Sequence, residues 1–256
     1  MDELRVVGCY LLPPFVVAEK KGFYAREQLK VTFDFATTAR EHNRGMLEGR
    51  WDISLTSPHT MFVKATRNGH DFVSYMMAEG GLAIKLAGVK GLKSPSEFRG
   101  RWPAGRWAPL IGPRVVGGVY NLFGRRRTDV SVYATTACWA RRAWVAENRD
   151  KMLRFVRAFV AGTDWVLKPE NREETLRLLQ DYQKISRKQA ELRLAQVTPK
   201  AAIVPEDLNR VVQHRIETGA YDRRPYVPVE RFYDASIWAE ATGLARPAPF
   251  GMPRPA

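Results

Sequence analysis

Hydroxyl and imidazole side chains stand where apolar runs of the sequence give way to helical patterns. They are Thr37, Thr38, Thr56, Ser57 and His59, with Arg40 one residue inside a predicted helix. Such groups suit hydrogen bonding to a small polar or anionic molecule. Each of them taken alone is also an ordinary helix cap. Their recurrence at successive corners favours a ligand-binding site more strongly than any one of these residues does alone.

A proline corner precedes these positions. The stretch PPFVVAEKKGFY (residues 13–24) predicts a short helix from about Pro14 to Lys21, because proline fits a first helical turn and glycine follows a last one. The preceding LRVVGCY is typical of a strand that ends near Tyr10. The turn between strand and helix comprises Leu12, Pro13, Pro14 and Phe15.

The theme of strand, polar corner, helix and glycine repeats through residues 1–88. KVTFDFA alternates like a strand, and Thr38 with Glu41 fits a capping box that starts a helix from about Ala39 to Glu48. WDISLTS predicts the next strand, Ser57 and Pro58 start another helix, and DFVSYMMA predicts a fourth strand. Strands alternating with short helices favour a largely parallel sheet covered by helices on both faces.

In such a sheet every corner after a strand lies at the same edge, where ligands bind. The N-termini of the helices near Pro14, Ala39 and Pro58 would therefore converge on one place. Free N–H groups and the helix dipole would favour an anion or an electron-rich polar group there.

Known catalytic and cofactor motifs are absent from the sequence. It has no Gly-rich nucleotide loop, no HExxH and no GxSxG, so neither catalytic nor metal-binding residues are expected, and no cofactor. The histidines are scattered at His42, His59, His70 and His214. The two cysteines, Cys9 and Cys138, lie far apart, and Cys9 is expected to be a small buried residue.

The 256-residue chain carries a formal net charge of +14, which raises the question of nucleic-acid binding. Seven arginines and no acidic residue fall within residues 99–127. Half of the basic excess therefore comes from one stretch, and no nucleic-acid partner is expected. No apolar run is long enough to span a membrane.

Several stretches are similar to one known group of proteins. They are PFVVAEKKGFYAREQLKVTF, GMLEGRWDISLTSP and AEGGLAIKLAGVKGLKSPSEFRG, followed by ARRAWVAENRDKMLRFVRAFVAGTDWVLKPENREETLRLL and, faintly, ERFYDASIWAEATG. In this order they resemble the solute-binding proteins of ABC importers for nitrate, sulfonate, taurine and thiamine precursors, the SsuA/TauA-like or NMT1/THI5-like family. No single motif is diagnostic.

The resemblance implies an α/β, two-lobe, periplasmic-binding-protein-like (type II) fold. Lobe 1 would cover residues 1–88, lobe 2 residues 89–194, and helices in residues 195–256 would return to lobe 1 before a disordered tail from about residue 245. Glu79, Gly80 and Gly81 would form the hinge. The expected ligand-binding residues, with His59 added for its place after Pro58, are Leu12, Pro13, Pro14, Phe15, Thr37, Thr38, Thr56, Ser57, Pro58 and His59.

Residues 99–132 depart from the family's pattern, and nine of the 29 residues in 99–127 are Gly or Pro. One interpretation is a basic loop in which Trp102 and Trp107 stack against nucleic acid or meet anionic lipid. A second is a linker left by an internal deletion. The third, which we favour, is a shifted reading frame or a faulty gene model. The second lobe is therefore expected to be incomplete.

The C-terminal half has helical patterns. Asn148 is expected to cap one helix, Pro169 to open a second through Tyr182, and Ser186 with Gln189 to form a capping box for a third. A fourth helix would begin at Pro205, and a fifth would follow Pro228, with its aromatic residues in the core.

The leading functional hypothesis is the substrate-binding component of an ABC importer, a monomer that is not an enzyme. It would capture a small anionic or aromatic solute of the sulfonate, nitrate, taurine or pyrimidine-precursor type and deliver it to the membrane permease. The alternatives are a non-binding remnant, a THI5-like pyrimidine-precursor synthase and a ligand-sensing module of a regulator. The synthase lacks support because the chain has no cysteine-rich stretch, and the sensing module because it has no helix-turn-helix.

Localisation follows from the resemblance, which implies a periplasmic or extracytoplasmic protein. No signal peptide precedes the first strand, so the protein is expected to be cytoplasmic if Met1 is the true start.

Overall fold

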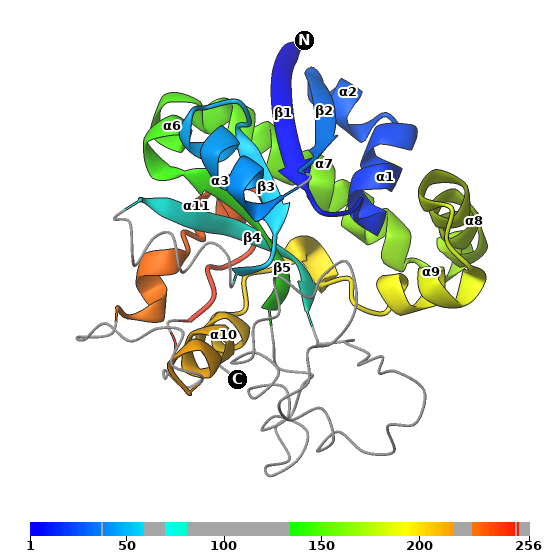
Figure 1. Cartoon of the computed structure of the whole chain (residues 1–256). Helices are drawn as coiled ribbons and strands as arrows, with labels where there is room; N and C mark the ends of the chain where they lie inside the picture. Colours follow the sequence, from blue (N-terminus) through cyan, green and yellow to red (C-terminus); the bar gives the residue numbers. More distant parts are fainter. Residues whose placement is uncertain (37, 59–69, 81–133, 218–226, 249, 251–256) are drawn as a thin grey trace.

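The computed structural model describes residues 1–36, 38–58, 70–80, 134–217, 227–248 and 250 (Figure 1). The strands are β1 (Asp2–Gly8), β2 (Leu29–Phe35), β3 (Ile53–Thr56), β4 (Phe72–Gly80) and β5 (Ala134–Arg141). The α-helices are α1 (Pro13–Lys20), α2 (Phe23–Arg26), α3 (Ala39–Leu47), α6 (Arg142–Glu147), α7 (Arg149–Leu167), α8 (Arg172–Gln183), α9 (Arg187–Leu194), α10 (Pro205–Glu217) and α11 (Ser236–Thr242). The 3₁₀ turns are η2 (Pro169–Asn171), η3 (Pro199–Ala201) and η4 (Val229–Phe232).

The five strands form one sheet in the order β2-β1-β3-β5-β4. β1 pairs in parallel with β2 and with β3, as the repeating pattern predicts. β5 lies antiparallel between β3 and β4, so the fourth strand of the chain is not a neighbour of the third. The α/β class is confirmed, whereas the antiparallel strand in the middle of the sheet was not predicted.

Helices cover both faces of this sheet. On one face, Leu4, Val6 and Tyr75 pack with α1, α7 and α11 in a core that contains Phe155, Phe159 and Trp238. On the other face, Val7, Met77 and Trp139 pack with α3, α10 and η4. Alternate residues of the same strand thus enter opposite cores, which is the pattern of a sheet buried on both sides.

Residues 134–194, which the family resemblance assigned to the second lobe, lie with this sheet. β5 is one of its inner strands, and α7 packs along α1. α8 and α9 lie beside α1 and bury Leu176, Leu179 and Leu194 against Val17 (Figure 1). The C-terminal helices also reach this body, since α11 packs on α7 and β4, and α10 on β5. The two-lobe division stays a prediction, and residues 81–133 fall outside the described part of the chain.

Several predicted helix starts are confirmed. Thr38 Oγ1 accepts a hydrogen bond from Glu41 N at 3.1 Å, and Ser186 with Gln189 forms a complete capping box. α10 begins at Pro205 as expected. Asn148 occupies the N-cap position of α7 but its side chain makes no capping bond; its Nδ2 donates to Trp144 O. The single helix predicted after Pro228 is in fact two elements, η4 and α11.

The contact between α1 and α7 depends on Gly162. A Cβ atom at this position would lie 2.5 Å from Pro14 O, closer than these atoms can approach, and 3.1 Å from the Cβ of Ala18, which is a tight contact. Gly162 therefore lets α7 lie directly against the proline corner of α1.

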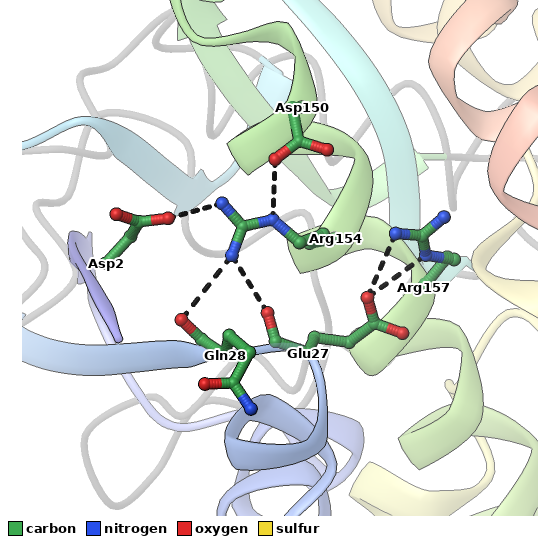
Figure 2. A network of polar contacts seen from close by, with 6 residues as sticks. All are labelled: Asp2, Glu27, Gln28, Asp150, Arg154 and Arg157. Carbon is green, nitrogen blue, oxygen red and sulfur yellow. Dashed lines mark hydrogen bonds and ion pairs between the residues drawn. The ribbon is translucent and has the colours of Figure 1, made fainter.

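Arg154 of α7 joins the beginnings of β1 and β2 (Figure 2). Its Nη1 donates to Glu27 O at 2.9 Å and to Gln28 O at 3.4 Å, in a turn where Gln28 has a φ of 56°. Its other nitrogens hold the carboxylates of Asp2 and Asp150. Arg157, one turn further, pairs with the Glu27 side chain, and it is more exposed than Arg154, at 40% against 16%.

Replacing Arg154 with methionine should lower the free energy of unfolding by about 1–3 kcal/mol, because two backbone carbonyls lose a charged donor. Urea denaturation of the purified chain measures this change. Arg157→Met is the matched control, and its exposed ion pair should contribute less than about 1 kcal/mol. Equal losses in the two variants would contradict this ranking.

Replacing Gly162 with alanine should also destabilise the chain, by about 1–3 kcal/mol, because the new methyl group collides with the backbone of α1. An exposed helical glycine would respond in the opposite direction, with a gain of about 1 kcal/mol. The sign of the change in urea denaturation distinguishes close helix packing from helix propensity.

Candidate functional site

The carboxyl ends of β1, β2, β3 and β4 lie at one edge of the sheet, and β5 begins there because it runs in the opposite direction. Gly80, the last residue of β4, pairs with Ala134, the first residue of β5. The chain therefore leaves the sheet and re-enters it at neighbouring points. This places Glu79 and Gly80, two of the three predicted hinge residues, at the exit point, whereas Gly81 lies outside the described residues.

The proline corner is part of the core. Leu12, Pro13, Pro14 and Phe15 are all buried, and the Phe15 ring packs 5.0 Å from the Phe33 ring and 5.4 Å from the Tyr24 ring, between centroids. Pro13 and Pro14 have no N–H group, so the first turn of α1 offers fewer donors to an anion than other helices do. A ligand contact at this corner stays a prediction.

The other predicted corners are near this edge as well. Thr38 follows β2 and uses its hydroxyl oxygen to cap α3. Thr56 is buried at the end of β3, Ser57 is half-buried, and Pro58 is buried. Thr37 and His59 lie outside the described residues, so their predicted role stays a prediction.

The end of β1 differs from the prediction at one residue. Cys9 is exposed, whereas we expected a small buried residue. Gly8, before it, has no room for a side chain, since a Cβ there would lie 2.8 Å from Leu55 O and 2.8 Å from the Phe33 ring.

Glu79 is the centre of a polar cluster that sequence reasoning did not find. Its side chain is fully buried, at 0% exposure, between β1, β4 and β5. Oε2 accepts hydrogen bonds from Tyr10 Oη and from Thr136 Oγ1, the second at 2.9 Å. Oε1 is buried and has no hydrogen-bond partner in the part of the chain that the structure describes. Tyr10, Glu79 and Thr136 come from three distant segments of the sequence, so no short motif could have predicted the cluster.

Opposing effects act on the pKa of the Glu79 carboxyl. Burial raises the pKa of the Glu79 carboxyl, while the hydrogen bonds from Tyr10 and Thr136 and the charge of Arg193 act in the opposite direction. Burial also raises the pKa of the Tyr10 hydroxyl. The Arg193 guanidinium lies over the Tyr10 ring, 4.2 Å from its centroid, which is a cation–π geometry.

Backbone contacts attach a further segment to the exit point. Gly80 N donates to Gln196 O at 2.9 Å, and Thr198 N donates to Ala78 O at 3.1 Å. The segment after α9 thus runs antiparallel beside the last residues of β4, where Val197 and Glu79 form an isolated bridge. It holds the backbone on both sides of Glu79 in place.

The opposite end of β4 carries a hollow of about 560 Å³, lined by charged residues that include Asp71, Arg142 and Arg246. Asp71 and Arg142 form an ion pair at 3.0 Å. None of the predicted ligand-binding residues lines it.

Within the described ranges, no three His, Cys, Asp or Glu residues come together as a metal site. Among the same residues, no helix has the length and apolar character needed to cross a membrane.

Comparison with solved structures identifies the fold. A Bordetella bronchiseptica RB50 protein superposes with a TM-score of 0.71 at 13% identity, covering 95% of this chain and 98% of its own. A Candida albicans gene product, described as having the generic periplasmic binding protein structural fold, superposes with a TM-score of 0.60 at 11% identity over 95% of each chain. The chain has the periplasmic binding protein fold.

Other chains with this fold have named functions. A putative periplasmic sulfonate-binding protein, SsuA from Methylobacillus flagellatus KT, superposes with a TM-score of 0.60 at 14% identity, covering 95% of this chain and 94% of its own. The desulfurization enzyme DszB superposes with a TM-score of 0.57 at 9% identity, covering 95% of this chain and 99% of its own. No protein-family model and no curated protein matches the sequence.

The raised pKa of Glu79 predicts how stability depends on pH. The folded chain holds this proton more tightly than the unfolded chain, whose carboxyl has the ordinary value of 4.5. The stabilisation is fully present below that value and is lost as the pH rises through the folded-state pKa. Glu79→Gln removes this titration, so its melting temperature should rise relative to wild type as the pH increases from about 4 to about 8.

Differential scanning calorimetry across this range measures the two melting curves. Glu170→Gln, an exposed glutamate with the same change of charge, is the control and should keep a constant offset from wild type. A Glu79→Gln curve parallel to wild type would show that the carboxyl titrates as it does in the unfolded chain.

Proposed function

We propose that the chain is the substrate-binding component of an ABC importer. The observation that carries this proposal is the pairing of Gly80 with Ala134, because a segment that leaves and re-enters the sheet at adjacent strands can form a second wall over the same edge. Two strands side by side are also a natural hinge, since few backbone dihedrals need to change for the walls to close. The solute would bind at the carboxyl edge of this sheet.

We infer the chemical class of the solute from the similar structures and from the charge near the proposed site. SsuA-type neighbours bind sulfonates by name, and Arg193 offers a positive charge beside the exit point. A small anionic or aromatic solute of the sulfonate, nitrate, taurine or pyrimidine-precursor type fits both. The chain would act as a monomer outside the cytoplasmic membrane, pass the solute to the membrane permease and have no nucleic-acid partner.

An enzymatic function is the alternative, supported by the similarity to DszB. Release of sulfur from a sulfonate, in place of its reversible binding, would favour that alternative. A non-binding remnant is the other possibility and would bind no solute at all.

Thermal unfolding against a panel of sulfonates, nitrate, taurine, aromatic carboxylates and pyrimidines tests the proposal. A ligand at about 100 times its dissociation constant should add about 2.7 kcal/mol of stability. For a chain of this size that is a rise in melting temperature of about 5–10 °C. A cooperative transition that no compound moves would contradict solute binding.

Replacing Ser57 with tryptophan should abolish the ligand-induced rise, because a large ring would fill the edge of the sheet next to Thr56. Ser236→Trp makes the same change at a half-buried serine at the start of α11 and should leave the rise intact. If the compound that stabilises wild type stabilises Ser57→Trp equally, the solute does not bind at this edge.

A further inference from the structure

Strand β2 is an end strand of the sheet, and no strand of the described part of the chain lies along its outer edge. Its inner edge pairs with β1 over all seven residues in one continuous register. A sheet edge is a template on which another strand can pair, and proteins commonly block it with proline, a bulge or charged side chains. The sequence of β2, LKVTFDF, has no proline, and its charged residues are Lys30 and Asp34. Whether this edge can accept a strand therefore depends on how those two charges are placed.

The hydrogen bonds to β1 determine which backbone groups of β2 point outward. Asp2 N donates to Gln28 O at 2.9 Å, as the parallel pairing of Asp2 with Leu29 requires. The N–H and C=O groups of successive strand residues point to opposite sides, so those of the even-numbered residues face β1. The residues that present these groups to the open edge are the odd-numbered ones, Leu29, Val31, Phe33 and Phe35.

The sequence of β2 is complementary to a second copy of itself that runs antiparallel. Thr32 is the middle residue of the strand, so a twofold axis at Thr32 pairs β2 with its copy over the whole length. Lys30 of each copy then lies opposite Asp34 of the other, on the same face of the sheet. This register also places odd-numbered residues opposite odd-numbered residues, which is what their outward N–H and C=O groups need in order to pair.

Other symmetric registers lose the charge pairs. A twofold axis at Val31 would place Lys30 opposite Thr32. An axis at Phe33 would place Asp34 opposite the same threonine. An axis between two residues would bring outward-facing backbone groups opposite inward-facing ones, so no hydrogen-bonded ladder could form. Full-length pairing and charge complementarity therefore both favour the axis at Thr32.

The two charged side chains can accept this additional contact. Lys30 is exposed and donates from Nζ to Glu3 Oε1 at 2.8 Å, which leaves its other N–H groups available. Asp34 Oδ2 accepts from Trp51 Nε1 at 2.6 Å, and Oδ1 takes no hydrogen bond from a described residue. The bond from Trp51 holds the carboxylate in place without using all of its acceptor capacity.

The opposite face of the strand pair would be apolar. Phe35 exposes 58% of its surface, more than any other described large hydrophobic residue except Met1, and its ring packs 5.1 Å from the Phe33 ring, between centroids. In the antiparallel pair, Phe35 would lie opposite Leu29 of the second copy, and Val31 opposite Phe33. Association would thus remove exposed apolar surface from water.

We propose that β2 is a self-association surface, where a second copy of this chain adds its own β2 in antiparallel direction with Thr32 on the twofold axis. The two sheets then form one continuous sheet, and the contact of Lys30 with Asp34 occurs twice. The proposed solute-binding unit stays the single chain, because the contact joins two complete sheets. The association needs no solute, so its test is independent of the proposed function.

Sedimentation velocity of the full chain should show a reversible equilibrium of monomer and dimer between about 1 and about 300 µM. A chain that remains monomeric throughout this range overturns the proposal.

Complementary charge reversals test the register. Lys30→Glu places a glutamate opposite Asp34, and Asp34→Lys places a lysine opposite Lys30, so each variant alone should dimerise at least about tenfold more weakly than wild type. An equimolar mixture of the two restores both contacts between opposite charges and should recover the dimer. Lys168→Glu makes the same change at an exposed lysine after α7 and should keep the wild-type affinity. Wild-type affinity in the separate variants, or no recovery in a mixture of variants that circular dichroism shows to be folded, overturns the pairing.

Amide hydrogen exchange of the wild-type chain gives a second test that needs no substitution. Exchange at Val31 and Phe33 should slow by at least about tenfold when the dimer forms, because their N–H groups gain partners. Thr32 and Asp34 donate to β1 in the monomer, so their amides should be protected in both states. A dimer in which Val31 and Phe33 exchange at the monomer rate has a different interface, and that result overturns the proposal.

Discussion

The antiparallel strand β5 is the constraint on which the rest of the structure depends. It lies between β3 and β4 and supplies hydrogen bonds to both, so without it the sheet would divide into a three-strand piece and a lone strand. Its register also sets where the chain can leave and return, because Gly80 and Ala134 are partners. The point where the chain leaves the sheet and the surroundings of Glu79 both follow from this one placement.

Helix α7 makes packing and polar contacts with several elements around that sheet. It buries Phe155 and Phe159 against one face, approaches α1 at Gly162, and reaches the start of β1 and β2 through Arg154. The Arg154 contacts lie at the starts of β1 and β2, away from the carboxyl edge, whereas the Gly162 contact lies at the proline corner that follows the carboxyl end of β1. Helix α7 thus contacts the body at both ends of these strands.

Local signals in the sequence predicted much of this fold. The proline start of α1, the Thr38 cap, the Ser186 capping box and the strands β1 to β4 each depend on residues within one short stretch. β5 was missed because ATTACWAR has little of the β-branched, alternating character of an inner strand, and its place in the sheet is set by tertiary pairing. The hinge at Glu79 and Gly80 came from resemblance, whereas the contacts of Glu79 with Tyr10, Thr136 and Arg193 join positions that no spacing rule connects.

The pairing of Gly80 with Ala134 also affects which mutations the fold can tolerate during evolution. Any length of polypeptide between two paired positions leaves the register of the sheet untouched, because closing a longer loop adds only a small entropic cost. Residues 99–127, with their seven arginines, fall wholly inside that interval. A mutation that rewrites, lengthens or trims the interval is therefore confined to it, and the pairing of the five strands is inherited unchanged.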